Sequence, residues 1–182
     1  EIMPSLVGSE MCIRDSPMAC ANLPYYITSP VLTALLEARC FSSVTVMVQK
    51  EVAQRMAAAP GSRDYSAFTV FCNYYAQPEL LFDVPPSCFL PQPKVTSSVI
   101  RLNVRQAPPY PVADEELFFR VVRASFAQRR KQLQNGLAAG FPALGKEIIG
   151  DILRNCGLSP TVRGETLDIP TFARIAAAIG RA

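Results

Sequence analysis

The stretch PMACANLPYYITSPVLTALLEARCFSSVTVMVQ, residues 17–49, has the pattern of a strand, a helix and a second strand, and this order predicts the fold class. Its two ends are apolar runs typical of buried strands: PMACA stops at Asn22, and SVTVMVQ (43–49) is β-branched, as expected of a strand covered on both faces. Between them, Ser29-Pro30 predicts a helix start, with a hydroxyl cap and a proline at the first helical position. Strand, helix and strand in this order predict an α/β protein.

Further along the chain, the pattern predicts one more helix and an antiparallel strand pair. KEVAQRMAAAP, starting at Lys50, predicts a helix that stops at Pro60-Gly61. YSAFTVFCNYYA (65–76) fits either a helix or a strand, and we favour a helix. ELLFDV (79–84) and SSVIRLNVR (97–105) predict antiparallel strands joined by the proline-rich PPSCFLPQPKV. On the second strand, alternate residues from Ser98 to Val104 share a face.

The last third of the chain has a helical pattern. RQAPPYP (105–111) has the composition of a linker. Helices are predicted at DEELFFRVVRASFAQ (114–128), RRKQLQNGLAAG (129–140), KEIIGDILRNCG (146–157) and DIPTFARIAAAIG (168–180). We therefore expect an α/β domain at 17–106, followed by a small all-helical domain at 107–182.

Composition excludes several kinds of site. The chain has no histidine, which excludes imidazole metal ligands and Ser-His or Cys-His nucleophile pairs. Its 6 cysteines include no CxxC pair, so we expect buried thiols for most of them and no metal site. No apolar run approaches the roughly 20 residues of a membrane span, so we expect a soluble, cytoplasmic protein with no membrane partner.

The net charge of +3 is unevenly distributed. Residues 1–100 carry 6 basic and 8 acidic side chains, whereas residues 101–182 carry 12 basic and 7 acidic ones. If charge alone is considered, solvated helix faces explain this excess of basic side chains. A surface that binds a polyanion is the alternative.

The segment before Pro17 differs from the rest of the chain. LVGSEMCIRDS (6–16) is the translation of a DNA string that resembles a transposase adapter used in sequencing libraries. It shows no hydrophobic periodicity. We interpret residues 1–16 as an artefact, with Pro17 near the start of the authentic protein. A genuine irregular N-terminal segment is the alternative.

NLPY (22–25) has groups suited to holding an amine. The Asn22 amide offers an acceptor on a rigid group, and proline interrupts the regular pairing of the backbone. The Asn22 amide oxygen and the Leu23 or Pro24 carbonyl can together bind the exocyclic amine of an adenine, so that its lone pair attacks an electrophilic methyl group. Tyr25 can stack on that base, which must have left its helix. A plain turn with tyrosines packed in the core is the alternative.

Four motifs resemble, in order and spacing, the small-subunit ribosomal RNA adenine dimethyltransferases. They are NLPYYITSP (22–30), VPPSCFLPQPKVTSSVIRL (84–102), FAQRRKQLQNGL (126–137) and RGETLDIPTFARIA (163–176). The first is shared broadly with amino-group methyltransferases, whereas FLPQPKV together with QRRKQLQN is more specific. The resemblance implies transfer of methyl groups from S-adenosylmethionine to two adjacent adenines near the 3′ end of 16S rRNA. It also implies a monomer that acts on the 30S ribosomal precursor in ribosome biogenesis.

The resemblance also assigns roles to residues. Asn22, Leu23, Pro24 and Tyr25 match the amine-gripping and base-stacking positions, and Asn22 and Pro24 match the edge of the cofactor site. Phe89 matches the ring on the other face of the adenine, although by itself a phenylalanine is usually a core residue.

A second set of residues is expected to contact the RNA backbone, for positioning rather than for reading sequence. It consists of Lys94, Arg120, Arg123, Arg129, Arg130 and Lys131. For Lys94 the alternative is a cap at a strand entrance, and for the others it is a solvated helix face.

One family feature is missing, namely the glycine-rich turn that follows the first strand and holds the cofactor. The 9 glycines include no G-x-G. We therefore expect residues 17–106 to be the C-terminal portion of a Rossmann-like, S-adenosylmethionine-dependent methyltransferase sheet. Residues 107–182 are expected to form a helical RNA-binding domain. The chain as given is expected to bind the cofactor poorly and to be inactive. Two other functions also fit: a large-subunit rRNA adenine methyltransferase of the macrolide-resistance kind, and a non-catalytic rRNA-binding assembly factor.

Overall fold

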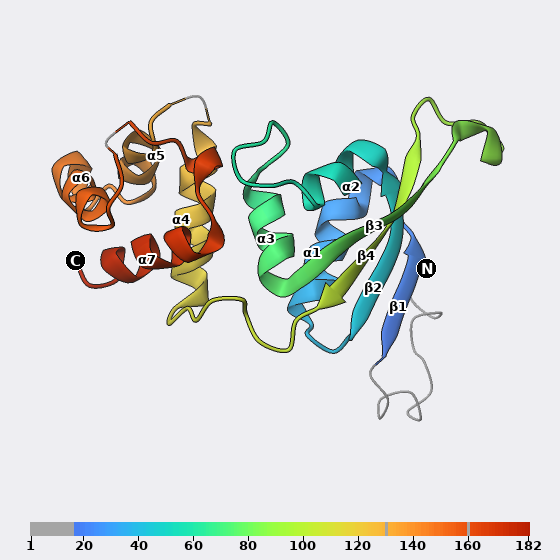
Figure 1. Ribbon diagram of the computed structural model, residues 1–182, viewed down its shortest axis with the longest axis horizontal. Helices are drawn as coiled ribbons and strands as arrows, with labels where there is room; N and C mark the ends of the chain where they lie inside the picture. The colour runs from blue at the N-terminus through green and yellow to red at the C-terminus, as the bar shows by residue number, and fades with distance from the viewer. Residues whose placement is uncertain (1–16, 130, 160) are drawn as a thin grey trace. The chain divides into compact units, whose positions relative to one another are not determined.

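A computed structural model describes residues 17–129, 131–159 and 161–182, so the predicted artefact at 1–16 lies outside the described residues. Figure 1 shows a mixed α/β protein, as predicted. The strands are β1 (Met18–Asn22), β2 (Ser43–Gln49), β3 (Ala76–Val84) and β4 (Ser97–Val104). The α-helices are α1 (Thr28–Glu37), α2 (Lys50–Met56), α3 (Ala67–Tyr75), α4 (Glu115–Ala127), α5 (Leu133–Gly140), α6 (Gly145–Asn155) and α7 (Ile169–Ile179). The described residues also form the short 3-10 helices η3 (Tyr25–Ile27), η4 (Pro86–Cys88) and η5 (Gly164–Thr166).

The described residues form two compact units, and the chain passes between them more than once. The sheet unit comprises the described residues up to Gln54 together with Tyr75–Gln106. The helical unit comprises Arg55–Tyr74 and Ala107–Ala182. Residues 55–74 thus belong to the same unit as the C-terminal helices, although they precede the predicted linker.

The sheet has the strand order β1-β2-β4-β3. β1 pairs parallel to β2, whereas β4 pairs antiparallel to both β2 and β3, as predicted for the last two strands. On β4, Ser98, Ile100 and Leu102 are all buried, which confirms their shared face. On β2, buried and half-buried side chains alternate, so the prediction of two fully covered faces holds for only one of them.

Helix α1 begins at Thr28, two residues before the predicted first helical residue Pro30, and has no side-chain cap. The 3-10 turn η3 leads directly into the helix, so the chain is already coiled and Ser29 is not needed as a cap. Thr28 instead donates its hydroxyl to the Pro24 carbonyl oxygen at 3.2 Å. Leu32 and Leu36, on the apolar face of the helix, are completely buried.

Other boundaries also differ from the sequence-based ones. α2 ends at Met56, before the predicted stop at Pro60, and α5 begins at Leu133 rather than at 129. Helix α3 confirms the helical interpretation of residues 65–76. Of the described cysteines only Cys72 is buried, so the expectation of mostly buried thiols is wrong. The others lie in the edge strand β1, in loops or at a helix end, where little covers a small side chain.

The helical unit has a close-packed aromatic and aliphatic core. The rings of Tyr74 and Phe118 stack with centroids 5.1 Å apart, and Phe118 and Phe172 are both fully buried. Helices α4 and α5 approach so closely that a Cβ atom on Gly136 would lie 2.5 Å from the Ala124 carbonyl oxygen. Glycine is therefore required at that position for packing.

Asp168, the first residue of the helix predicted at 168–180, caps α7 by accepting a hydrogen bond from the Thr171 N–H at 3.0 Å. Hydrogen bonding to Thr171, assisted by the nearby Arg174 charge, lowers the pKa of the Asp168 carboxyl. A lowered pKa in the folded state means that this stabilisation is complete above the ordinary value of about 3.9 and is lost as the pH falls through the lowered pKa.

We expect Asp168→Ala to lower the free energy of unfolding at neutral pH by about 1 kcal/mol. Asp168→Asn keeps a capping oxygen that does not titrate, so its unfolding free energy should fall less steeply than that of the wild type on acidification below about pH 4. Urea unfolding over that pH range measures both effects. Parallel pH curves for the wild type and Asp168→Asn would contradict the assignment.

Within the described residues, no helix is long and apolar enough to cross a membrane. The same residues contain no group of three or more cysteine, aspartate or glutamate side chains placed to hold a metal ion.

Candidate functional site

The NLPY residues and the loop between β3 and β4 line one hollow of the sheet unit, with a volume of about 260 Å³, which we call the NLPY hollow. Its lining residues are Asn22, Leu23, Pro24, Tyr25, Phe89, Pro91 and Pro93. Five of these seven are the residues that the sequence analysis selected, and they come from two segments more than sixty residues apart. The fold therefore brings the two parts of the predicted site together.

Strand pairing places Asn22 at the edge of the sheet. It is the last residue of β1, opposite Met47 of the parallel strand β2. The Leu23 N–H donates to the Met47 carbonyl at 3.2 Å, which extends the pairing by one residue and fixes the Leu23 peptide. The carboxyl ends of parallel strands are the usual place for a ligand in α/β sheets.

The two backbone carbonyls of the motif differ in their hydrogen bonds. The Pro24 carbonyl accepts from the Ile27 N–H at 3.1 Å and from the Thr28 hydroxyl at 3.2 Å, so both of its lone pairs are used. Among the described residues, none donates a hydrogen bond to the Leu23 carbonyl. Of the two candidates, the Leu23 carbonyl is the acceptor that remains open.

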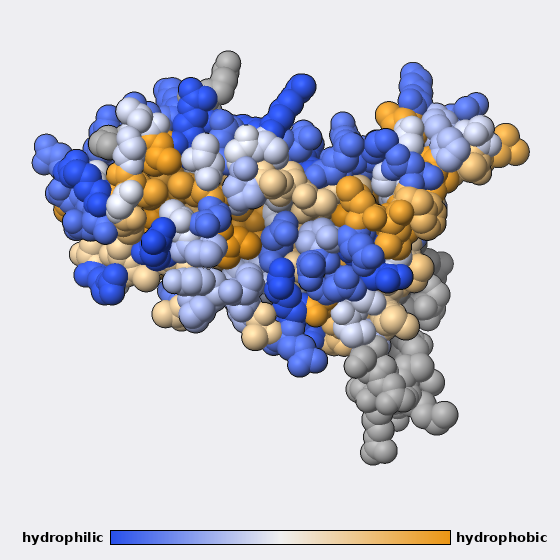
Figure 2. All heavy atoms as spheres, viewed as in Figure 1, coloured by the Kyte–Doolittle hydropathy of each residue, from blue (hydrophilic) through white to orange (hydrophobic). Residues whose placement is uncertain are grey.

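Two aromatic rings complete the hollow. Tyr25 is 37% exposed, and its hydroxyl lies 2.8 Å from the Ser97 Oγ. Phe89 is half-buried, follows η4 and lines the hollow, so it is not a core residue. Leu90, joined to Pro91 by a cis peptide bond, is fully exposed. Figure 2 shows apolar atoms at the surface of this protruding loop, at the upper right of the view.

The lining of the NLPY hollow contains no carboxylate, ammonium or guanidinium group. An ion pair of the sheet unit lies in a different hollow, where Lys50 Nζ is 2.6 Å from Asp83 Oδ2. There, hydrogen bonds from Lys50 and Ser98 lower the pKa of Asp83. The NLPY hollow thus offers amide and carbonyl acceptors between two rings, a combination suited to a flat, uncharged ligand that carries an amine.

The sequence analysis missed some members of the site. Pro91 and Pro93 belong to the quoted FLPQPKV motif, whose prolines give the signal for a rigid wall. Ser97 carries no comparable signal, because a serine in a strand is usually a packing residue. Lys94 is exposed and follows Pro93, but it does not line the hollow.

The predicted RNA-contacting residues of the helical unit that the structure describes are all exposed, and Arg130 lies outside the described residues. Arg120 donates to the Gly140 carbonyl at 2.9 Å and its guanidinium lies 4.5 Å from the centroid of the Phe141 ring. The side chains of Arg123 and Lys131 make no hydrogen bond or ion pair within the described residues. These two cations therefore have their charges available to a ligand.

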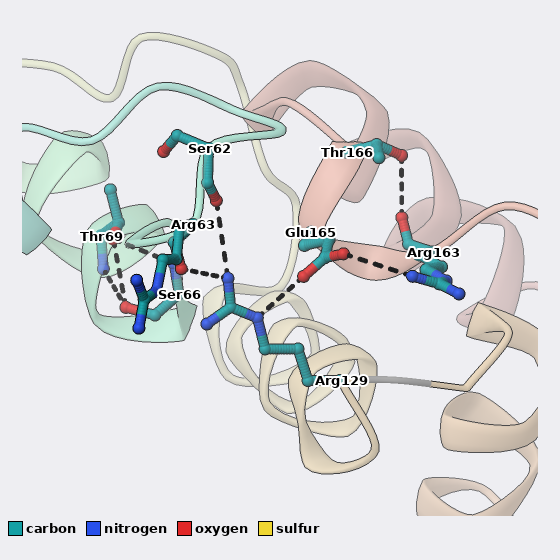
Figure 3. A network of polar contacts seen from close by, with 8 residues as sticks. All are labelled: Ser62, Arg63, Ser66, Thr69, Arg129, Arg163, Glu165 and Thr166. Atoms are coloured by element: carbon teal, nitrogen blue, oxygen red, sulfur yellow. Dashed lines mark hydrogen bonds and ion pairs between the residues drawn. The ribbon is translucent and has the colours of Figure 1, made fainter.

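Arg129 instead connects two loops of the helical unit (Figure 3). Its Nε lies 2.8 Å from a Glu165 carboxylate oxygen, and its guanidinium also donates to the Ser62 and Arg63 carbonyls. The Gly61 N–H donates to the Glu165 carbonyl at 2.7 Å, so residues 61–63 are held to residue 165 by both backbone and side chain. Arg129 has a structural role in addition to any role in binding.

Arg129 also lines a second hollow, of about 480 Å³, together with Arg55 and Arg63, which we call the arginine hollow. The rings of Phe68 and Phe126 lie in its wall, and Asp64 is the one carboxylate among its lining residues. The sequence analysis did not select Arg55 or Arg63. Each is an isolated cation in the sequence, and the cluster forms only when the chain folds.

Comparison with known proteins gives one family. The family model described as ribosomal RNA adenine dimethylase matches residues 3–169. This match begins within the segment 1–16, whose origin as an artefact stays a prediction. The ribosomal RNA small subunit methyltransferase A of Caldanaerobacter subterraneus subsp. tengcongensis is 51% identical over 160 residues, covering 87% of this chain and 59% of that protein. The protein of the same name from Geobacillus kaustophilus is 47% identical over 178 residues, covering 96% and 61%. The chain thus spans about three fifths of the length of these two relatives.

Two solved structures share the fold. A dimethyladenosine transferase from Plasmodium falciparum superposes with a TM-score of 0.80 and 24% identity, covering 90% of this chain and 66% of that one. The 23S rRNA methyltransferase ErmE superposes with a TM-score of 0.65 and 22% identity, covering 92% and 69%. At these identities the likeness concerns the fold alone.

Proposed function

Because the chain belongs to the ribosomal RNA adenine dimethylase family, we propose that its full-length protein transfers methyl groups to the exocyclic amines of two adjacent adenines near the 3′ end of small-subunit rRNA. The observation that carries this proposal is the meeting of Asn22, the open Leu23 carbonyl, Tyr25 and Phe89 at one uncharged hollow.

The two acceptors define how the amine is held. The Asn22 amide oxygen and the Leu23 carbonyl each accept one N–H of the adenine amine, which turns the nitrogen lone pair out of conjugation with the ring. That nitrogen then becomes a nucleophile without a strong base. The absence of histidine and of any carboxylate in the lining fits this chemistry, because the methylated nitrogen is acidic enough to lose its proton to water.

The two rings hold the base itself. Tyr25 and Phe89 stack on the faces of an adenine that has left its helix, and stacking of this kind is worth roughly 1–3 kcal/mol per base. At about 260 Å³ the hollow is just below the 300–1,000 Å³ range of small-molecule sites. It therefore has room for one flat base rather than for a base and a whole nucleoside cofactor.

S-adenosylmethionine, when bound, supplies the methyl group. The residues described here fit the cofactor only at its edge, where Asn22 and Pro24 line the hollow, because the chain offers no Gly-x-Gly turn and the lining has no carboxylate for a ribose. We therefore assign to these residues only the binding and orientation of the adenine.

The exposed cations are proposed to bind the rRNA backbone. Among the described residues, Arg123 and Lys131 have no side-chain partner, whereas Arg129 and Arg120 also make contacts within the helical unit. Lys94 is exposed on the loop that carries Phe89, where it can reach a phosphate next to the bound adenine.

Arg123→Ala and Lys131→Ala are expected to weaken rRNA binding by the full-length protein and to lower the slope of log affinity against log salt by about 1 each. Because these charges position the RNA, kcat at saturating RNA should change little. Lys146→Ala, which removes an exposed cation from α6 of the same unit, is the matched control. Equal losses for the control and the two test variants would contradict the assignment.

The functional test is a map of dimethyladenosine in the rRNA of cells with and without the full gene. The proposal predicts that two adjacent dimethyladenosines disappear from small-subunit rRNA. Their disappearance from large-subunit rRNA would instead favour the macrolide-resistance kind of enzyme, whose fold ErmE shares with this chain. An unchanged map would favour a non-catalytic assembly factor.

We further propose that the protein acts as a cytoplasmic monomer on the 30S ribosomal precursor. The residues that line the NLPY hollow all belong to one chain, so a second protein chain is not needed to complete the hollow. Light scattering of the full-length protein and co-sedimentation with precursor particles test the two parts of this proposal.

A further inference from the structure

We propose that Ser97 is a positioning residue, whose hydroxyl holds the ring of Tyr25 in the position needed to stack on the bound base. This inference rests on the proposed function and deepens it, because it adds a residue that acts on the site without lining it. The observation behind it is the 2.8 Å hydrogen bond between the Tyr25 hydroxyl and the Ser97 Oγ, across 72 residues of sequence.

Tyr25 needs such a tether. Its ring is 37% exposed and borders an open hollow, so packing does not cover the side that must meet the base. The Tyr25 side chain has more than one staggered position about its Cα–Cβ bond, and a change between these positions moves the ring together with its hydroxyl. Ser97 is the one described hydrogen-bond partner of the Tyr25 hydroxyl. Without it, the ring can swing while its backbone stays in place.

Ser97, by contrast, is held rigidly. It is completely buried and is the first residue of β4. Its backbone lies opposite Gln49 of β2 on one side and Val84 of β3 on the other. A hydroxyl at this place has a fixed position relative to the sheet edge where Asn22 ends β1.

Ser97 also closes the loop that carries Phe89. The loop leaves the sheet after Val84 and returns at Ser97, and these two residues lie opposite each other in the β3–β4 pair. The anchor of the Tyr25 ring is therefore the same residue that ends the Phe89 loop. The buried Ser97 hydroxyl thus holds the Tyr25 ring at the point where the loop that carries Phe89 rejoins the sheet.

The neighbouring Ser98 provides a matched control. It is 2% exposed, lies on the same strand with its side chain on the opposite face, and donates to Asp83 Oδ1 at 2.6 Å. Ser98→Ala removes an equally buried hydroxyl from β4 but leaves the Tyr25 tether intact.

The kinetic test uses Ser97→Ala, Tyr25→Phe, their double variant and Ser98→Ala in the full-length protein, with rRNA as substrate. We expect about a fivefold fall in kcat/KM for each of the first two, the size expected from one net hydrogen bond. The double variant should be no worse than either single one, because both remove the same bond. Ser98→Ala should stay within about twofold of the wild type. Additive losses, or an equal loss in Ser98→Ala, would overturn the proposal.

Tyr25→Phe removes the same bond from the exposed side, so it keeps the test decisive if Ser97→Ala fails to fold.

A second measurement does not depend on catalysis. In the full-length protein with ¹³C-labelled tyrosine rings and no RNA, the Tyr25 signal is the one absent from Tyr25→Phe. We expect it to shift in Ser97→Ala and to stay unchanged in Ser98→Ala, and an unchanged signal in Ser97→Ala would overturn the proposal. A wild type that methylates no rRNA would refute the proposed function, while the NMR result still decides the role of Ser97.

Discussion

Asn22→Ala in the full-length protein is expected to lower kcat for adenine methylation at least about 100-fold and to leave rRNA affinity within about twofold. The Asn22 amide and the Leu23 carbonyl are the two acceptors proposed for the amine, and the Leu23 carbonyl alone cannot fix both of its hydrogens. In the Asn22→Ala variant, the lone pair of the amine nitrogen therefore stays conjugated with the adenine ring. The RNA should stay bound because its proposed backbone contacts are made by other residues.

The measurement is single-turnover methyl transfer together with an RNA titration. Asn103→Ala is the matched control, since Asn103 is an exposed asparagine near the far end of β4 whose amide donates to Glu79 at 3.3 Å. It should behave like the wild type. Normal methylation by Asn22→Ala would rule out the amine grip, and a parallel loss of RNA affinity would make Asn22 a docking residue instead.

Phe89→Ala is expected to lower kcat/KM by about 5- to 150-fold, the range that corresponds to the loss of one stacked aromatic ring. Phe89 is half-buried and lines the hollow, whereas the next residue, Leu90, is fully exposed and does not. Leu90→Ala therefore removes an apolar side chain from the same loop without removing the wall of the hollow, and should keep nearly full activity.

Steady-state methylation of rRNA by the two variants, with Phe89→Trp as a variant that keeps a ring, measures this contrast. Phe89→Trp should recover much of the activity lost in Phe89→Ala. If Leu90→Ala lost as much as Phe89→Ala, the loop would act through its overall conformation, and the stacking role of Phe89 would be wrong.

The elements around the NLPY motif were predictable because their signals are local. Alternation of apolar residues identified the antiparallel β3–β4 pair, and the apolar runs on either side of Asn22 identified the β1–α1–β2 unit. The predicted family and its Rossmann-like methyltransferase fold are confirmed by the family match and the two similar structures.

The differences come from contacts that a local pattern does not contain. Helix α1 starts at Thr28, two residues before the predicted Pro30, because the preceding 3-10 turn supplies the first coil of chain. The choice between the Leu23 and Pro24 carbonyls depends on that same turn, which uses the Pro24 oxygen. Ser97 and the cluster of Arg55, Arg63 and Arg129 depend on tertiary pairing between distant segments. The resemblance identified the site, and the structure adds the partners of its residues.

The central claim is that an extruded adenine is held between Tyr25 and Phe89 with its amine on Asn22 and Leu23. The most direct measurement is a crystal structure of the full-length protein bound to an rRNA fragment that contains the target adenines. The account predicts an adenine in the NLPY hollow, with its amine nitrogen within hydrogen-bond distance of the Asn22 amide oxygen and the Leu23 carbonyl. An adenine that stays stacked in its helix, or one bound in another hollow, would contradict it.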